Sequence, residues 1–334
     1  MKKLYLISND KIWISEKNYT SNNDLNNILS CLNSEYEIDL ISRRSFKRFN
    51  YLINERFNFC EIKNINKKDL NILMISITPY NFFSLIKLIL LKKKIKGFVF
   101  LRSDGFLEYK IRYGFFGYIL YFIMFYLIKK KLKIIAVSNK FNHVKVQNII
   151  HPSELTDEWF IRKKIEENIK TDFLYVGRFK KEKGVNYLIK IFKENLNQYQ
   201  LTIVGTEKKL IDERYYDKNI NFVEPVTKLS ELIDLYDSCR IFILPSFTEG
   251  FPKVISEALA RLKPIIIFEE IKHVAVNREG IFVCKRNEKN IIETINYILK
   301  NYKEIKKKIS QNRHYTKNEF KKELLNTIKD EFTN

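Results

Sequence analysis

The chain has 334 residues, of which 45% are hydrophobic and 30% charged, and it contains only nine Gly and six Pro. This composition excludes an intrinsically disordered chain, and the length is too great for one ordinary core, so we expect two folded domains of about 150 residues each. Sixty Lys and Arg against 39 Asp and Glu give a net charge of +21, which is compatible with a nucleic acid or an anionic membrane as partner, or with a general bias in residue usage.

The positive charge is concentrated in the first half of the chain. Residues 1–150 hold 26 basic and 11 acidic residues, a net charge of +15, which leaves +6 for the remainder. A bias in residue usage does not explain this asymmetry, so we expect the basic surface on the N-terminal domain.

Cysteine usage and the N-terminal residues predict a cytoplasmic protein. The apolar run 4–7 breaks at Ser8-Asn9-Asp10, before the core of a secretion signal could form. The chain has four widely spaced cysteines without a C-x-x-C pair, which predicts neither a zinc site nor a disulfide framework: Cys31, Cys60, Cys239 and Cys284.

Short apolar runs alternate with amphipathic stretches in the first half, the pattern of βαβ units that feed a parallel sheet. Helices are expected at 22–33 and 79–93. The expected strands are 3–8, 36–41, 71–77, 97–101 and 133–137.

The segment 114–128 is apolar around its whole circumference and has basic neighbours on both sides. Fifteen helical residues span only ~22 Å against a hydrocarbon core of ~30 Å, which argues against a membrane-spanning helix. Two interpretations stay open: a helix packed on the sheet, or an interfacial helix whose basic flanks are attracted to anionic lipid.

A second series of strands follows the polar stretch 151–170, which is the expected linker. We therefore predict one domain at 1–160 and another at 161–334. The strands expected in the second domain are 173–176, 200–204, 241–244 and 264–268.

The first motif of this second domain, residues 177–184, lies between a predicted strand and a predicted helix. Gly177 permits a tight turn at the carboxyl end of the sheet, where α/β proteins bind ligands. Arg178 and Lys183 could present two cations to a diphosphate. Taken alone, the segment could equally be a solvated basic loop.

The second motif, residues 245–258, is again a strand end followed by a turn and a helix start. Pro252 suits the first helical position, so that the amides of 250–253 form an anion-accepting helix N-terminus. Glu249 lies in the turn and Glu257 eight residues later in the helix. The alternative is that Glu257 is an ordinary surface residue and Glu249 a partner of the helix dipole.

With both motifs in this order, residues 173–286 resemble the retaining glycosyltransferases of family 4, which have the GT-B fold. The resemblance consists of G-R-x-x-x-x-K-G at 177–184 and E-x7-E at 249–257. It implies an α/β fold in which two Rossmann-like domains face each other across a cleft. Departures from the family pattern are Ser8-Asn9-Asp10 after the first strand, Arg261-Leu262 before Lys263, and a missing second Gly after Gly205.

The resemblance also implies roles for individual residues of the donor site. Arg178 and Lys183 would bind the departing diphosphate, Glu249 would orient the transferred sugar, and Glu257 would accept hydrogen bonds from the ribose. The donor-binding set is completed by Gly177, Gly250, Phe251 and Lys253.

In the N-terminal domain, the strand 97–101 ends at the place where the family often has a catalytic histidine. Here Asp104 is a candidate for contact with the sugar or the acceptor, and Arg102 and Ser103 are candidates for acceptor binding. The alternative is that Asp104 and Gly105 simply form a turn. The sequence contains no D-x-D pair and its histidines lack metal-ligand spacing, so we expect no metal and no cofactor.

These observations predict a metal-independent glycosyltransferase that moves a sugar, with retention, from a nucleoside diphosphate sugar to a glycan or lipid-linked acceptor. We expect a role in cell-envelope polysaccharide or lipopolysaccharide synthesis, at the inner face of the membrane and without nucleic acid as partner. Two alternatives are a basic nucleic-acid-binding protein and an inactive sugar-nucleotide-binding relative.

Overall fold

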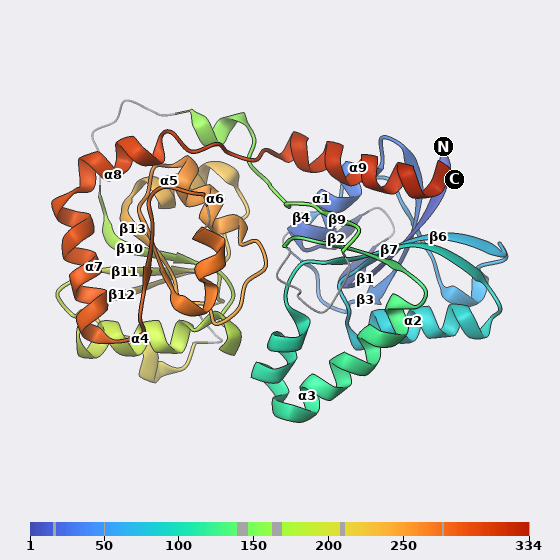
Figure 1. The fold of residues 1–334 in the computed structure, drawn as a ribbon, viewed down its shortest axis with the longest axis horizontal. Helices are drawn as coiled ribbons and strands as arrows, with labels where there is room; N and C mark the ends of the chain where they lie inside the picture. Colours follow the sequence, from blue (N-terminus) through green and yellow to red (C-terminus); the bar gives the residue numbers. More distant parts are fainter. Residues whose placement is uncertain are drawn as a thin grey trace. The chain divides into compact units, whose positions relative to one another are not determined.

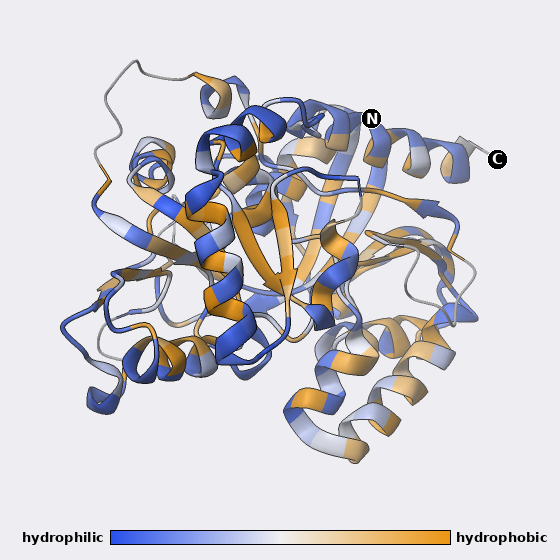
Figure 2. Cartoon of the chain, turned by 60° about the vertical axis from the view of Figure 1, so that its left-hand side comes forward, coloured by the Kyte–Doolittle hydropathy of each residue, from blue (hydrophilic) through white to orange (hydrophobic). Residues whose placement is uncertain are grey.

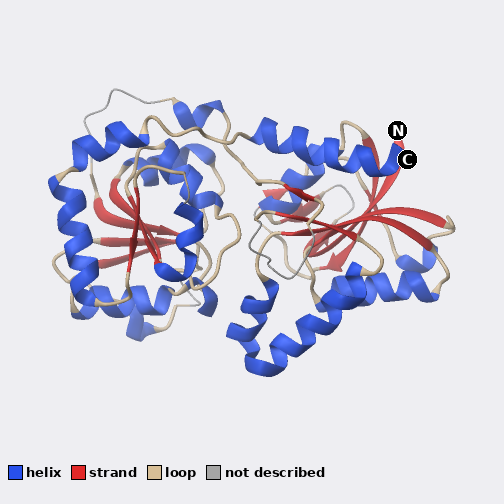
Figure 3. Cartoon of the chain, in the orientation of Figure 1, coloured by secondary structure: helices blue, strands red, loops and turns tan. Residues whose placement is uncertain are grey.

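The structure is a computed structural model that describes residues 1–15, 18–49, 51–138, 146–161, 169–207, 211–275 and 277–333. It divides into two compact units (Figure 1). Met1–Glu154 and Lys317–Asn334 form the N-terminal unit, and Leu155–Thr316 form the C-terminal unit. Each unit has its own sheet with helices packed around it (Figure 3).

The core of the N-terminal sheet is parallel, in the order β5-β3-β1-β6-β7-β8-β9, and an antiparallel extension, β2 and β4, pairs with the end of β1. All predicted strands of this half are present. Their bounds are β1 Lys2–Ile14, β2 Tyr19–Ser21, β3 Tyr36–Arg44, β4 Tyr51–Leu52, β5 Asn58–Phe59, β6 Asp69–Ile75, β7 Lys94–Leu101, β8 Lys133–Ala136 and β9 Asn148–Ile149.

Strand β1 continues beyond the predicted break at Ser8-Asn9-Asp10. The register with β3 shifts between Ile7 and Lys11, so the polar residues occupy a bulge within the strand. Ser8 Oγ donates to the Asp10 carboxylate at 2.6 Å and accepts from the amide of Asp10 at 3.2 Å, so a backbone donor in the bulge has a side-chain partner.

The helices that the described residues of this unit form on the sheet are α1 Asn23–Leu32, α2 Pro79–Leu90, α3 Gly105–Lys129 and α9 Lys317–Thr333. The first two agree with the predicted helices, and each begins after a side-chain cap: Asn22 accepts from the amide of Leu25, and Thr78 from that of Asn81.

Helix α9 corrects the predicted second domain, which was expected to run to residue 334. It buries Leu324 and Ile328, and its Phe320 ring stacks on Phe100 of β7 at 6.4 Å between centroids. Because these apolar side chains complete the N-terminal core, the last helix belongs to the N-terminal unit. The boundary after Glu154 also lies six residues before the predicted one, and residues 162–168 of the expected linker lie outside the described residues.

Helix α3 begins at Gly105, nine residues before the predicted start, and kinks at Gly114, whose φ of 67° and ψ of −152° suit glycine. After the kink, one face of the helix is buried, with Tyr121, Phe125 and Ile128 in the core. The opposite face exposes apolar side chains: Phe115, Phe116, Ile119, Leu120, Phe122, Ile123, Tyr126 and Leu127. The structure confirms the packed helix for the buried face, and the interfacial interpretation stays a prediction for the exposed face.

By length and composition alone, α3 is the one helix among the described residues that could cross a membrane. The kink leaves residues 115–129 as its longer straight part, which spans about 22 Å.

The C-terminal sheet is entirely parallel, with the order β12-β11-β10-β13-β14-β15. This is the 3-2-1-4-5-6 order of a Rossmann fold, and its topological switch point lies between β10 and β13. The strands are β10 Thr171–Val176, β11 Leu201–Val204, β12 Ile220–Val223, β13 Cys239–Leu244, β14 Ile265–Phe268 and β15 Ile281–Cys284.

The helices around this sheet turn apolar residues toward the strands and polar residues outward, as the colours in Figure 2 show. The α-helices are α4 Val185–Glu194, α5 Leu229–Asp237, α6 Lys253–Ala260, α7 Glu288–Lys300 and α8 Tyr302–Ile309. Short 3-10 helices include η2 Asp157–Phe160, η3 Lys181–Lys183 and η6 Glu269–Ala275.

Candidate functional site

The two sequence motifs lie next to each other at the carboxyl edge of the C-terminal sheet. One follows β10 and the other follows β13, so they flank the switch point. Gly184 has a φ of 69°, and a Cβ there would lie 2.0 Å from the carbonyl oxygen of Pro245. The amide of Phe247 donates to the carbonyl of Glu182 at 2.9 Å. Only glycine at 184 permits this close contact between the loops.

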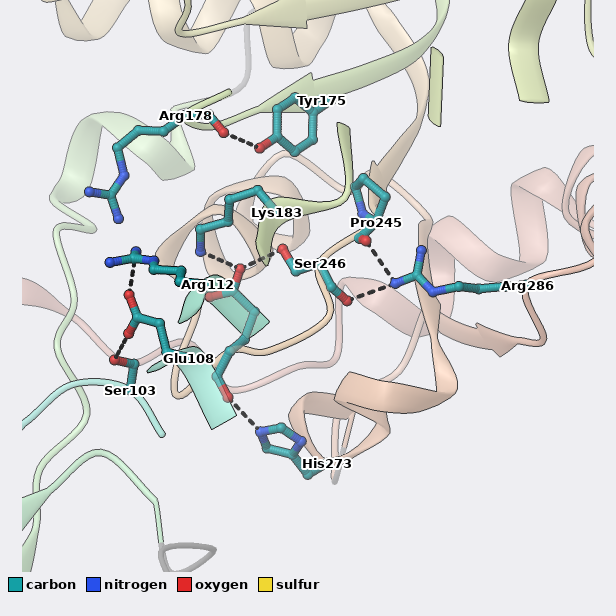
Figure 4. A network of polar contacts seen from close by, with 11 residues as sticks. Ser103, Glu108, Arg112, Tyr175, Arg178, Lys183, Pro245, Ser246, His273 and Arg286 are labelled. Atoms are coloured by element: carbon teal, nitrogen blue, oxygen red, sulfur yellow. Dashed lines mark hydrogen bonds and ion pairs between the residues drawn. The ribbon is translucent and has the colours of Figure 1, made fainter. Parts of the chain in front are cut away.

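Lys183 and Glu249, the two motif residues predicted to act on the donor, form an ion pair. Lys183 Nζ lies 2.6 Å from Glu249 Oε1, and both side chains are mostly buried. Ser246 Oγ donates to the same carboxylate oxygen at 2.7 Å (Figure 4). The backbone carbonyl of Glu249 lies 2.9 Å from His273 Nε2. Glu249 is thus held at both its side chain and its backbone.

Arg178 differs from Lys183 because its side chain is exposed. Its backbone carbonyl accepts a hydrogen bond from Tyr175 Oη at 3.1 Å, and the guanidinium makes no hydrogen bond or ion pair with any residue that the structure describes. A Cβ on Gly177 would lie 2.5 Å from the same phenol oxygen, so a larger residue would displace this loop. Arg178 is therefore a cation held on a well-anchored backbone.

Glu257 is buried, which excludes the interpretation as an ordinary surface residue. Its Oε2 accepts a hydrogen bond from Tyr236 Oη at 2.7 Å. Burial, followed by the nearby Glu257 charge, raises the pKa of Tyr236 well above its ordinary value, so the phenol stays protonated and donates.

Helix α6 begins at Lys253, and Pro252 is its N-cap rather than its first helical residue, one position from the prediction. Gly250 is buried beside it, and the Phe251 ring lies 5.2 Å from the guanidinium of Arg278. Burial lowers the pKa of Arg278 to about 10. The predicted donor-binding residues 250–253 therefore do lie at a helix N-terminus.

Arg286 supports the second loop and was missed from the sequence. Its Nη2 donates to the carbonyls of Pro245 at 2.7 Å and Ser246 at 3.0 Å (Figure 4). Its Nε lies 2.5 Å from a carboxylate oxygen of Glu270. Its guanidinium also lies 4.1 Å from the centre of the Phe247 ring. The sequence feature that could have indicated this role is the position of Arg286 two residues after the apolar strand β15, at the carboxyl edge of the sheet. Tyr236 had no comparable signal, because its partner Glu257 is 21 residues away. Ser246, whose partner Glu249 is three residues away, lies inside the second motif but was given no role.

In the N-terminal unit, the three predicted residues already have intramolecular partners. Asp104 is the N-cap of α3, where it accepts from the amide of Leu107 at 3.1 Å, and Gly105 begins the helix, so the two residues do not form a separate turn. Arg102 lies 3.2 Å from Asp24, and Ser103 Oγ donates to Glu108 at 2.8 Å. Glu108 in turn pairs with Arg112 (Figure 4).

The departures from the family pattern have structural consequences. Leu262 has a φ of 56°, a left-handed conformation that favours glycine over leucine. Arg261 is buried and donates to both carboxylate oxygens of Asp237, at 2.8 and 2.7 Å, and to the carbonyls of Trp159 and Ile161. Arg261 thus connects the end of α6 with α5 and with the η2 segment that contains Trp159.

The described residues contain no group of three or more His, Cys, Asp or Glu side chains that could hold a metal ion. Independence from metal ions and cofactors stays a prediction.

Comparison with known proteins shows what the part of the chain that carries this site is similar to. Residues 157–315 match the family described as glycosyl transferases group 1. Over 163 residues the chain is 30% identical to the capsular polysaccharide biosynthesis glycosyltransferase CapM of Staphylococcus aureus, a match that covers 45% of this chain and 42% of that protein. Over 165 residues it is 29% identical to an uncharacterized glycosyltransferase of Haemophilus influenzae, covering 47% and 45%.

A shorter match, 31% identical over 77 residues, is to the N,N'-diacetylbacillosaminyl-diphospho-undecaprenol alpha-1,3-N-acetylgalactosaminyltransferase of Campylobacter jejuni, covering 22% of this chain and 20% of that protein. The matched regions span less than half the length of each of these curated relatives.

Solved structures show the same fold over the whole chain. Sucrose-phosphate synthase of Thermosynechococcus elongatus has a TM-score of 0.73 at 12% identity and covers 100% of both chains. HepE of Anabaena in complex with UDP-glucose has a TM-score of 0.69 at 13% identity, covering 99% and 100%. The chain has the GT-B fold, as the sequence predicted.

Proposed function

Starting from the match of residues 157–315 to the group 1 glycosyltransferases, we propose that this chain transfers a glycosyl group from a nucleoside diphosphate sugar to a hydroxyl group. The observation that carries the proposal is the contact between the two motif loops at the switch point, which places Lys183 on Glu249. Parallel α/β sheets bind ligands at this position.

The leaving diphosphate is the main charge that such a site must stabilise. Arg178 is an exposed cation that needs no rearrangement to bind it. Lys183 is already held by Glu249, so it would meet the diphosphate in a fixed position, and the α6 N-terminus would add backbone amides around Gly250, Phe251 and Lys253. Gly177 keeps the first loop close to the sheet.

The remaining roles follow the family resemblance. Glu249 would orient hydroxyls of the transferred sugar, and Glu257 would accept from the ribose. Arg102, Ser103 and Asp104 would contact the acceptor or the sugar from the N-terminal domain. The proposed reaction proceeds with retention, without a covalent nucleophile and without a metal ion.

The proposed acceptor is a glycan or lipid-linked intermediate of cell-envelope polysaccharide or lipopolysaccharide synthesis. The names of two relatives support this class: one is a capsular polysaccharide glycosyltransferase, and the other acts on a diphospho-undecaprenol substrate. We propose a cytoplasmic enzyme, with no nucleic acid among its partners.

We also propose that the exposed face of α3 associates with an anionic membrane surface. Phe115 and Phe116 are 70% and 82% exposed, which is unusual for large apolar residues close together. Lys129 and Lys130 lie over the Tyr126 ring at the end of the same helix, within the stretch 1–150 that has a net charge of +15. Binding to anionic but not to neutral vesicles is the expected result, and equal binding to both would contradict this proposal.

Replacement of the two motif cations tests the donor site. Arg178→Ala should lower turnover at least about a hundredfold and leave stability unchanged, since the side chain is exposed. Lys183→Ala should lower turnover similarly but also destabilise the domain, because it leaves the Glu249 carboxylate without its cation. Donor hydrolysis, measured alongside thermal melting, checks both.

Lys181→Ala is the matched control, since it removes an exposed cation from the same loop and should leave turnover unchanged. Undiminished turnover in both motif variants would reject the donor site. A wild-type protein that binds a nucleoside diphosphate sugar but neither transfers nor hydrolyses it would instead support an inactive relative.

A further inference from the structure

The environment of Glu257 contains a group that the proposed function does not yet use. Glu257 lies on α6 and is only 7% exposed, and Tyr236, on α5, is completely buried. The 2.7 Å hydrogen bond between them joins two helices that are separated by β13 in the sequence. A buried phenol that donates to a carboxylate restricts the rotation of both side chains.

Tyr236 is itself immobilised by its neighbours. The Trp159 ring of η2 packs edge-on against it at 5.7 Å, and the Phe242 ring of β13 lies at 5.6 Å. Arg261, the C-cap of α6 and one turn after Glu257, binds both the carbonyl of Trp159 and the carboxylate of Asp237, the residue next to Tyr236. The aromatic neighbours thus fix the phenol of Tyr236, and Arg261 connects the ends of the two helices that carry Tyr236 and Glu257.

We propose that Tyr236 is the positioning residue that orients Glu257 for the ribose hydroxyls of the donor nucleotide. This inference rests on the proposed function, in which Glu257 binds the ribose. A carboxylate whose Oε2 is fixed by Tyr236 presents a defined direction to a diol. Without the phenol, the side chain has further rotamers, and the ribose would have to select one of them when it binds.

The test compares ribonucleotides with nucleotides that lack the ribose hydroxyls. Dissociation constants of UDP, GDP and ADP, and of their 2′,3′-dideoxy counterparts, are measured by calorimetry for the wild type and for Tyr236→Phe. For the nucleotide that binds most tightly, Tyr236→Phe should raise the dissociation constant of the ribonucleotide about tenfold. This is the effect expected from the loss of one charge-assisted hydrogen bond. The affinity for the dideoxy counterpart and for inorganic pyrophosphate should stay unchanged.

Tyr302→Phe is the matched control. The Tyr302 phenol lies in the same domain and donates to the carbonyl of Arg240 at 2.9 Å, not to Glu257. Removal of this hydroxyl should therefore not alter the preference for ribose. In the Glu257→Ala background, Tyr236→Phe should have no further effect on that preference, because the phenol would have no carboxylate to orient.

A second variant leaves the phenol in place. Glu257→Asp shortens the side chain by one methylene, so the carboxylate cannot reach both Tyr236 and the ribose, and the preference for ribose should fall. An unchanged preference in Tyr236→Phe, or a preference retained in Glu257→Asp, would overturn the inference. A wild type that binds none of the three ribonucleotides would reject the proposed function instead.

Discussion

At the scale of single residues, Arg286 shows how a side chain outside the motifs can determine their shape. Its guanidinium lies between the rings of Phe247 and Phe268, at 4.1 and 4.3 Å, while its donors bind two carbonyls of the loop that carries Glu249. Cation–π contact and hydrogen bonds to backbone carbonyls are each stronger when they are shielded from water.

Arg286→Met keeps an apolar side chain against these rings but leaves the carbonyls of Pro245 and Ser246 without their donor. The free energy of unfolding of the C-terminal domain should fall by about 2 kcal/mol, the cost of buried acceptors without a partner. Arg240→Met serves as control, because Arg240 is half-exposed and lies 3.6 Å from Asp172, a surface pair expected to contribute less than about 1 kcal/mol. Urea denaturation compares the two, and equal stabilities would contradict the assigned role of Arg286.

At the scale of secondary-structure elements, α3 offers two phenylalanines in contrasting environments on one helix. Phe125 is buried and packs against Phe106 with 5.2 Å between ring centroids. Phe122 is 51% exposed, and its ring stacks on that of Tyr126 at 6.4 Å. The same substitution at the two sites therefore separates packing from surface binding.

Phe125→Ser should lower the free energy of unfolding of the N-terminal domain by about 3 kcal/mol or more, as for other large-to-small core changes. Phe122→Ser should leave that free energy within about 1 kcal/mol and weaken binding to anionic vesicles, since it removes apolar surface that would enter the interface. Vesicle co-sedimentation and melting curves measure both effects. Vesicle binding that survives Phe122→Ser undiminished would show that this face does not enter the lipid.

At the scale of the whole molecule, helix α9 places the end of the chain in the N-terminal domain. Its Phe332 ring lies 6.4 Å from those of Tyr36 and Phe98, and Asn148 donates to Thr327 at 2.9 Å. Helix α9 also lies near Cys31 of α1: burial raises the pKa of this thiol to about 11, and the charges of Lys317 and Lys321 oppose that shift. The thiol can therefore report on whether α9 is in place.

Deletion of residues 317–334 should make Cys31 reactive toward a thiol reagent at pH 8. Cys239 and Cys284 should remain protected, because they are buried in the other domain, where burial raises both pKa values to about 12. In the full chain only half-buried Cys60 should react, and Lys322→Ala, an exposed change on α9, should leave this pattern unchanged. Exposure of Cys239 together with Cys31 would mean that α9 stabilises both domains.

Much of the architecture could be predicted from local patterns. Apolar runs such as 173–176 and 241–244 became β10 and β13, because a strand buried on both faces needs continuous apolar residues. Gly177, Gly184 and Pro252 marked the turns, since their backbone preferences are intrinsic. The alternation of strands and helices predicted βαβ units and parallel sheets, and the family resemblance implied two Rossmann-like domains.

The order of the strands and the partners of the site residues depended on tertiary structure. Lys183 pairs with Glu249, Tyr236 donates to Glu257 and Arg286 donates to two loop carbonyls, and all three contacts were absent from the prediction. The pairing of Tyr236 with Glu257, 21 residues apart, exists only once β13 has placed α5 and α6 on one side of the sheet. The helix 317–333 has an apolar face that could cover either sheet, and only the packing of Phe320, Leu324 and Ile328 assigned it to the N-terminal one. The sequence by itself determined the elements and the motifs, because backbone preference and hydrophobic periodicity act over a few residues. Packing across the whole domain decided which buried surfaces meet. The free energy of packing depends on side-chain shapes that fit together only in the folded chain.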